Sequence, residues 1–152
     1  MSLDFEIYAA KGKEFVSLVA DELNISPVMA GRVIRAVFHA LRNWLSHEES
    51  FQLVAQLPMS LKGVYVDGWK FDKDFGLIVH LNDFLDEVRT EDNGLSGYDF
   101  LNNSKAVLAV AAVFKALNYF TDEDEMNEII NVLPAGLKSF VSESLAGSGT
   151  VL

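Results

Sequence analysis

The chain contains no cysteine and only three prolines among its 152 residues. Without cysteine it has no disulfide framework, no thiolate nucleophile and no cysteine ligand for zinc. A chain of this length buries roughly 68–70% of its unfolded surface, so a hydrophobic core alone can stabilise it. We therefore expect one domain that folds without covalent or metal staples, in a reducing compartment.

Long apolar runs are also missing. The longest covers nine residues, from Ala106 to Phe114, about half of the ~18–20 that a membrane helix needs. The start of the chain, MSLDFEIYAAKGK, lacks a basic stretch followed by an apolar one, which predicts no signal peptide. We expect a cytoplasmic protein with no membrane partner.

Positive charge is scarce, and it is unevenly placed. The net charge is −10, and residues 67–152 hold 6 basic and 15 acidic groups, whereas residues 1–66 hold 6 and 7. Such a chain repels phosphate backbones and anionic surfaces at long range. The composition therefore argues against nucleic-acid binding.

Motifs for cofactors and nucleophiles are absent as well. Neither G-x-x-x-x-G-K-[ST] nor G-x-G-x-x-G occurs, and His39, His47 and His80 lie far apart with no H-E-x-x-H. The segment DKDFG at 72–76 has oxygens at the first and third positions of a calcium loop but lacks the later ligand and glycine. Ser96 lacks the G-x-S-x-G spacing of a nucleophile elbow. We predict no cofactor, no metal and no catalytic residue.

An internal repeat is the strongest feature that is present. When residues 30–62 are aligned without gaps to residues 106–138, eleven of the 33 positions are identical. The segments KEFVSLV (13–19) and NDFLDEV (82–88) also pair, but at a shift of 69 instead of 76. The difference predicts a seven-residue insertion in EDNGLSGYDF. The identical residues of the first copy are Ala30, Ala36, Val37, Phe38, Ala40, Leu41, Glu49, Leu57, Pro58, Leu61 and Lys62.

The first copy has the start and stop signals of four helices. A first helical region covers 5–23, which Gly12 could interrupt. Ser26-Pro27 predicts a second helix reaching about Leu45, with serine as N-cap and proline in the first turn. Ser46 and Glu49 have the spacing of a capping box and open a third. Pro58 ends that helix or opens a fourth, from Met59 to about Val66.

The second copy repeats these signals. Thr121-Asp122-Glu123-Asp124 opens its third helix, with acidic groups favoured by the helix dipole. Pro134 begins its last helix, which should end near Gly147. One local pattern competes, because VYVDGWKF around Asp67-Gly68 is typical of a β-hairpin. Its counterpart FVSESLAG has no such alternation, so the repeat favours helix at both places.

The second helix of each copy is apolar on nearly every side, which is typical of a central, buried helix. We therefore predict an all-α protein made of two tandem pseudo-symmetric helical repeats, about four helices each, packed as one domain. Repeat one covers about 5–66, a linker covers 67–76, repeat two covers about 77–146, and 147–152 form a mobile tail. The dipeptide Leu-Pro occurs at 57–58 and again at 133–134. In this fold both dipeptides mark corners between helices rather than a functional site.

The segment RAVFHALRNWLSHEESFQLVAQLPMSLKGVYVDGW resembles a bacterial family of uncharacterised domains. The similarity extends over about residues 13–143 and is looser in the second copy, where Val132-Leu133-Pro134 replaces A-Q-L-P. The resemblance implies an all-helical fold and no assigned activity, so it implies no catalytic residues. The residues that carry it are Ala36, Val37, Leu41, Leu45, Ser46, Glu49, Ala55, Gln56, Leu57, Pro58, Leu61, Asp67, Gly68 and Trp69.

A basic stripe is the clearest candidate for a site. Arg32, Arg35, His39 and Arg42 share one helical face, and the second copy has no such stripe. Three interpretations are open: a solvated or internally paired face, a docking surface for an acidic helix, and a site for a small anion. Because the helix is otherwise buried, we expect at least one arginine to be partly buried and paired with a carboxylate. The second copy has Leu108, Ala111, Lys115 and Asn118 at these positions.

The function that follows is a non-enzymatic protein–protein interaction module, with an unidentified protein or a second copy as partner. The alternative is a small-ligand-binding protein with a cleft between the repeats, where Asp67 and Trp69 would anchor the cleft or an interface. A third reading is an enzyme that uses carboxylates such as Asp83 and Glu87. Paired carboxylates at this spacing are common on solvated helix faces, so they specify little.

Overall fold

The computed structural model describes residues 3–70 and 80–148, in which helices joined by loops occur and no β-strand is present. The all-α prediction is confirmed. None of the helices in this part of the chain has the length and apolar character that a bilayer crossing requires. The eight helices are α1 (Phe5–Leu23), α2 (Pro27–Trp44), α3 (His47–Ala55), α4 (Met59–Val66), α5 (Leu81–Asp92), α6 (Asn103–Phe120), α7 (Glu123–Val132) and α8 (Ala135–Ser148).

Side-chain caps explain where these helices begin. The Ser26 hydroxyl accepts the Met29 N–H at 3.2 Å ahead of α2. At α3, Ser46 accepts the Glu49 N–H at 3.1 Å, and the Glu49 carboxylate accepts the Ser46 N–H at 2.8 Å. This reciprocal pair is the predicted capping box.

The cap of α7 lies one residue later than Thr121. Asp122 accepts the Glu125 N–H at 2.8 Å, and Glu125 accepts the Asp122 N–H at 3.0 Å. The Thr121 hydroxyl donates instead to the Leu117 carbonyl at 2.8 Å, so this residue closes α6. Thr121 thus ends α6, and the adjacent Asp122 caps the start of α7.

The helices of the second half begin at regular distances from those of the first. Pro27, His47 and Met59 open α2, α3 and α4, and the first residues of α6, α7 and α8 follow each of them after 76 positions. The sequence left open an interruption near Gly12, and the structure shows that α1 is continuous there. Gly12 is buried against α4 instead, where a small residue is needed for close packing.

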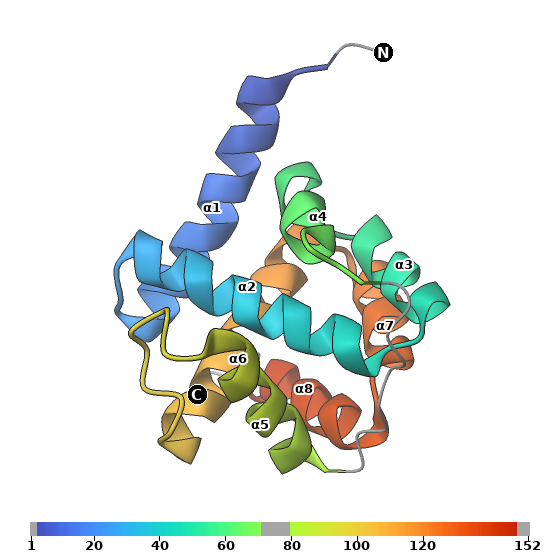
Figure 1. Cartoon of the computed structure of the whole chain (residues 1–152). Helices are drawn as coiled ribbons and strands as arrows, with labels where there is room; N and C mark the ends of the chain where they lie inside the picture. The colour runs from blue at the N-terminus through green and yellow to red at the C-terminus, as the bar shows by residue number, and fades with distance from the viewer. Residues whose placement is uncertain (1–2, 71–79, 149–152) are drawn as a thin grey trace.

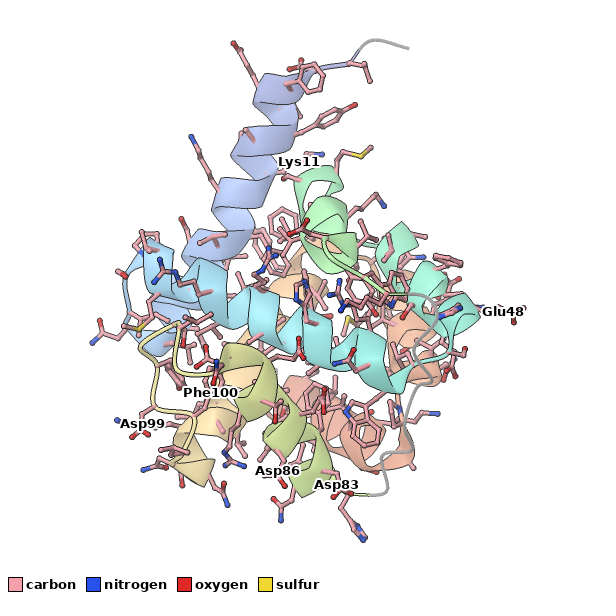
Figure 2. All side chains as sticks on the ribbon, in the orientation of Figure 1. Lys11, Glu48, Asp83, Asp86, Asp99 and Phe100 are labelled. Atoms are coloured by element: carbon pink, nitrogen blue, oxygen red, sulfur yellow. The ribbon has the colours of Figure 1, made fainter. Side chains whose placement is uncertain are left out.

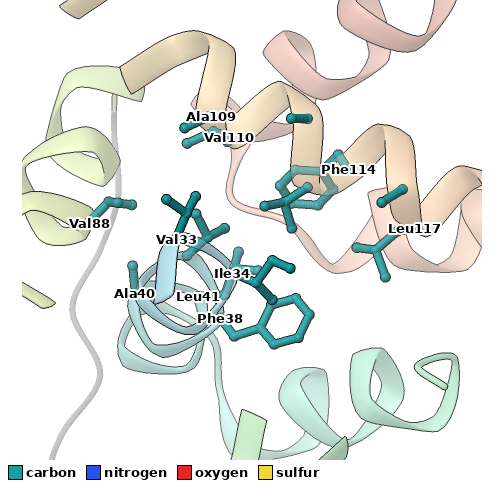
Figure 3. Close-up of a cluster of buried hydrophobic side chains, with 14 of the residues drawn as sticks. Val33, Ile34, Phe38, Ala40, Leu41, Val88, Ala109, Val110, Phe114 and Leu117 are labelled. Carbon is teal, nitrogen blue, oxygen red and sulfur yellow. The ribbon is translucent and has the colours of Figure 1, made fainter. Parts of the chain in front are cut away.

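The core lies between α2 and α6. Figure 3 shows Val33 and Ile34 of α2 on the side of this helix that faces Phe114 and Leu117 of α6, whereas the Phe38 ring extends away from those two residues. All five side chains are essentially inaccessible to solvent, and full burial of each contributes roughly 1.5–3 kcal/mol. α6 buries residues around most of its circumference, whereas α2 keeps one polar side.

That polar side of α2 faces α4 and α5, which flank it in Figure 1. α3 packs against α7, and α8 packs against α6. α1 crosses α6, α2 and α4, but its first turns extend beyond the rest of the fold (Figure 1). Most of the predicted linker, from residue 71, and the last four residues of the predicted tail lie outside the described residues.

Candidate functional site

The α2 polar face consists of Arg32, Arg35, His39 and Arg42. Because these residues recur every three or four positions, one side of α2 carries all of them. The structure places this face between the last turn of α4 and the end of α5, and each of the four side chains has a partner within the chain.

Arg42 is buried and binds the end of α4. Its guanidinium donates to the carbonyl oxygens of Tyr65 at 2.8 Å and Asp67 at 2.7 Å. The last carbonyls of a helix have no partner within the helix, and a cation is favoured there by the helix dipole. Burial lowers the pKa of Arg42 from its ordinary value, chiefly by desolvation, yet a guanidinium stays charged at neutral pH. Arg42 therefore works as a cap for α4.

His39 binds the same helix end. Its Nε2 lies 2.8 Å from the Val64 carbonyl oxygen, and since a carbonyl only accepts, the proton is on Nε2. Burial lowers the pKa of His39 to about 4, helped by the charges of Arg42 and Arg35 and opposed by the bond to Val64. The ring is thus neutral near pH 7, and its Nδ1 carries a lone pair 4.0 Å from the Glu91 carboxylate.

Arg32 and Arg35 are exposed, so their contacts compete with water. Arg35 pairs with the Asp67 carboxylate, and this hydrogen bond and charge lower the pKa of Asp67. Arg32 donates to the Leu95 carbonyl oxygen at 3.1 Å. The sequence predicted one arginine that is both partly buried and paired with a carboxylate. In the structure Arg42 is buried, but it binds carbonyl oxygens. Arg35 pairs with a carboxylate, but its side chain is 47% exposed.

A cavity of about 310 Å³ opens beside this face, between α2 and the end of α5. Arg32 and Arg35 supply positive charge, while Glu91 and the Nδ1 lone pair of His39 supply acceptors. Asn43 donates to Glu91 at 3.2 Å and helps to orient it. The walls suit a small molecule that carries both an anionic group and a donor. The lining residues are Arg32, Arg35, Ala36, His39, Glu91, Asp92 and Leu95.

Asp67 and Trp69 do not meet in this cavity. Asp67 is exposed and is held by Arg35. Trp69 packs edge-on against Tyr65, His47 and Phe51, with ring centroids 5.8, 5.7 and 5.9 Å away. The indole therefore belongs to an aromatic cluster over α3 and α4 and is not among the residues that line the cavity.

The remaining sequence candidates have structural partners. Asp83 accepts the His80 N–H at 3.1 Å at the start of α5, and Glu87 accepts from Asn43 at 2.6 Å. The Ser96 hydroxyl accepts the Tyr98 N–H at 3.0 Å within a loop. Over residues 3–70 and 80–148 no three acidic or histidine side chains gather as metal ligands would. The segment 72–76 lies outside the described residues.

An apolar groove between α1 and α4 was not predicted. It measures about 640 Å³, and Pro27 at the start of α2 also lines it. The two helices approach closely because Gly12 has no side chain: a Cβ there would lie 2.3 Å from the Ser60 Oγ. That hydroxyl donates to the Tyr8 carbonyl at 2.8 Å and links the helices. The lining residues are Ala9, Gly12, Lys13, Val16, Ser17, Pro27, Ser60, Leu61 and Val64.

The first turn of α1, which we call the α1 overhang (residues 5–8), directly precedes Ala9 at the edge of the groove. In Figure 2 the N-terminal end of α1 projects beyond the other helices, although α4 still reaches it at Tyr8, whose carbonyl oxygen accepts from the Ser60 hydroxyl. Phe5 is 70% exposed, and its ring meets Tyr8 edge-on with centroids 6.2 Å apart. The recurrence of Phe5, Ala9, Gly12 and Val16 on one helical face was the sequence signal for this surface.

Comparison with known proteins gives one family. The sequence model of a family described as "Uncharacterized conserved protein (DUF2267)" matches residues 12–140. None of the curated proteins matches the chain.

Proposed function

Since the chain belongs to the DUF2267 family of uncharacterised conserved proteins, whose description assigns no activity, we propose from its geometry that it is a non-enzymatic protein–protein interaction module. One observation carries the proposal. The apolar face of α1 continues past the core that covers it, and it borders an apolar groove on the same side.

The change along α1 is abrupt. Gly12, Phe15 and Val19 are buried in the fold, whereas Phe5, about two to four turns earlier on nearly the same face, is 70% exposed. An aromatic side chain that stays in water forfeits roughly 1.5–3 kcal/mol of burial. Exposed apolar groups that adjoin a groove are typical of interaction surfaces. A helix laid into such a groove is a common mode of recognition.

The α2 polar face supports this reading less well. Arg42 and His39 hold the end of α4, and Arg35 is engaged by Asp67. A partner that used these groups would have to replace bonds already made within the chain. Docking at this face stays a prediction, and the α1–α4 groove is the better candidate surface.

The chemistry of the cavity favours a role without catalysis. A general base works best when its pKa lies near the working pH, whereas burial brings the pKa of His39 down to about 4. Such an imidazole is a poor proton acceptor at neutral pH. It is suited to accepting a hydrogen bond at Nδ1.

Site-specific photo-crosslinking in the cells that make the protein tests the proposal. Phe5→p-benzoylphenylalanine places the probe beside the groove, and Ile7→p-benzoylphenylalanine is the matched control. Ile7 is 51% exposed but lies on the far side of α1 from Val16, nine positions away at about 100° per residue. We expect a discrete crosslinked protein with the first probe and none with the second. Equal products at both positions, or none at either, would refute the interaction surface.

The second candidate is small-ligand binding in the cavity beside the α2 polar face. Its support is the separation of charge across the cavity, with Arg32 and Arg35 on one wall and Glu91 on the other. A small zwitterion with a carboxylate and an ammonium group fits this layout. Thermal melting with a panel of free amino acids tests the idea. Stabilisation that disappears in Arg32→Gln supports binding, and an unchanged melting temperature with every ligand rejects it.

We also propose the finer organisation expected from the sequence. The two halves, about 5–66 and 77–146, would be copies of one helical unit in a cytoplasmic bacterial protein. The spacing of 76 residues between the starts of α2, α3 and α4 and those of α6, α7 and α8 supports this. Separate expression of the two halves tests it, because copies that share one core should fold only together.

A further inference from the structure

We propose that the partner at the α1–α4 groove is a second copy of this chain, a step that rests on the interaction surface proposed above. Each copy would lay its α1 overhang antiparallel along α1 of the other and insert Phe5 into the groove. The result is a two-fold symmetric dimer.

The shapes on one helix are mutually complementary. The α1 overhang provides a projecting aromatic ring at Phe5, and the groove lies along residues 9–17 of the same helix. Eight residue steps of an α-helix measure about 12 Å, which matches two turns of an incoming helix. When a projection and a recess lie side by side on one element, a two-fold axis between them satisfies both at once. The contact then closes as a dimer and leaves no recess for a third copy.

The small residues of α1 set the register. Ala9 and Ala10 lie between the overhang and the middle of the groove, and both are exposed. Two helices can approach closely where their crossing residues are alanines. With the axis between these alanines, Phe5 of one copy reaches the level of residue 14 in the other, beside Val16. In the same register Glu6 of one copy faces Lys13 of the other.

Charge supports the same arrangement. The overhang and its cap are acidic through Asp4 and Glu6, while the groove has Lys13 on its rim. Within the described chain no carboxylate pairs with this lysine. Each copy carries a net charge of −10, so two copies repel at long range. A Debye length of about 8 Å at physiological salt screens much of that repulsion and leaves the contact pairs decisive.

The contact is small, so the dimer should be weak. Two helical turns from each side bury less than the standard interface of about 1,600 Å². We expect a dissociation constant on the order of 10 μM. The dissociation constant should be lower at high salt than at low salt, because salt screens the net repulsion between the two copies.

Sedimentation velocity of the full chain between about 1 and 500 μM tests the inference. Phe5→Ala should weaken the dimer at least tenfold, whereas Ile7→Ala, at another exposed apolar position on the opposite face, should change the dissociation constant less than twofold. Lys13→Glu should also weaken it, and the double variant Glu6→Lys with Lys13→Glu should restore it, since both contacts are then reversed. Position 5 is the first residue of α1 and stands outside the core, so circular dichroism should show an unchanged fold.

Three results would overturn the second copy as partner: a monomer at 500 μM, equal weakening by the two alanine variants, and no rescue in the charge-swapped double variant. These results would disprove the second copy as partner without disproving the interaction surface itself. A monomer whose position-5 probe crosslinks to a different protein keeps the surface and removes the second copy. A monomer with no crosslink at position 5 removes both.

Discussion

The hydroxyl oxygens of Ser50 and Tyr65 lie 2.8 Å apart in the interior, where both side chains are fully buried. The bond joins α3 to α4 and gives each hydroxyl its partner. Burial raises the pKa of Tyr65 above its ordinary value, even though the bond to Ser50 acts in the opposite direction. The phenol is therefore neutral throughout the physiological range.

The two hydroxyls of this pair should be energetically coupled. We expect Tyr65→Phe to lower the free energy of unfolding by about 1–3 kcal/mol, because the Ser50 hydroxyl is left buried without a bond. Ser50→Ala combined with Tyr65→Phe should lose less than the two single changes together. Urea unfolding of the four proteins measures this cycle. A coupling near zero would show that the bond adds no stability.

Arg42 and Arg35 should differ sharply in their effect on stability. Arg42→Met removes a buried cation and leaves the Tyr65 and Asp67 carbonyl oxygens without it, so we expect a loss of about 2–4 kcal/mol. Arg35→Met removes only an exposed ion pair, which solvent screens, so we expect a much smaller loss. Chemical denaturation of both variants makes the comparison. Losses of equal size would contradict the assignment of Arg42 as the cap of α4.

The pH dependence of stability should carry a contribution from His39. Its pKa is about 4 in the folded protein against an ordinary value of 6.5, so the fold prefers the neutral ring. The associated stability is complete above pH 6.5 and is lost as the pH falls from 6.5 toward 4, because the unfolded chain takes up the proton first. The loss amounts to at most about 3 kcal/mol.

Urea unfolding at several pH values between 7 and 4 measures this effect. His39→Gln should flatten that part of the profile relative to the wild type. His80→Gln, at an exposed position, should leave it unchanged. If His39→Gln keeps the full slope, carboxylates rather than His39 are responsible for it.

The effect of Gly12→Ala on the free energy of unfolding should depend on the residue at position 60: a loss with serine and a gain with glycine. In the wild type the new Cβ would lie 2.3 Å from the Ser60 Oγ, which breaks the bond to Tyr8 and crowds the crossing. We expect a net loss of about 1–2 kcal/mol despite the better helix propensity of alanine. In a Ser60→Gly background the same change should stabilise by up to about 1 kcal/mol. Thermal unfolding of the four proteins decides, and equal signs in both backgrounds would refute the steric explanation.

The helix boundaries could be predicted because their signals are local. Ser26, Pro27, Ser46 and Glu49 act within one turn, so the sequence alone places them. The role of Gly12 could not be predicted for the opposite reason. Gly12 lacks a side chain where α1 packs against Ser60, which is 48 positions away. No pattern in the nearby sequence predicts that contact.

The same limit applies to the candidate site. The periodicity of α2 predicted that Arg32, Arg35, His39 and Arg42 share a face, but it could not predict that Arg42 would be buried. The burial comes from the end of α4, which supplies the carbonyl oxygens, and from the packing of α5 alongside. The groove was missed because its second wall belongs to another helix.

The dependence of α4 on α2 has a consequence for the order of folding. α4 has only eight residues, too few for a helix to persist alone in water, and two side chains of α2 bind its last carbonyls. α4 should therefore form after α2 has settled on the core. Pulsed hydrogen–deuterium labelling during refolding would then find the amides of α4 protected later than those of α2. The wall of the groove would be among the last parts of the molecule to assemble, so a chain that is still folding would have no surface with which to associate.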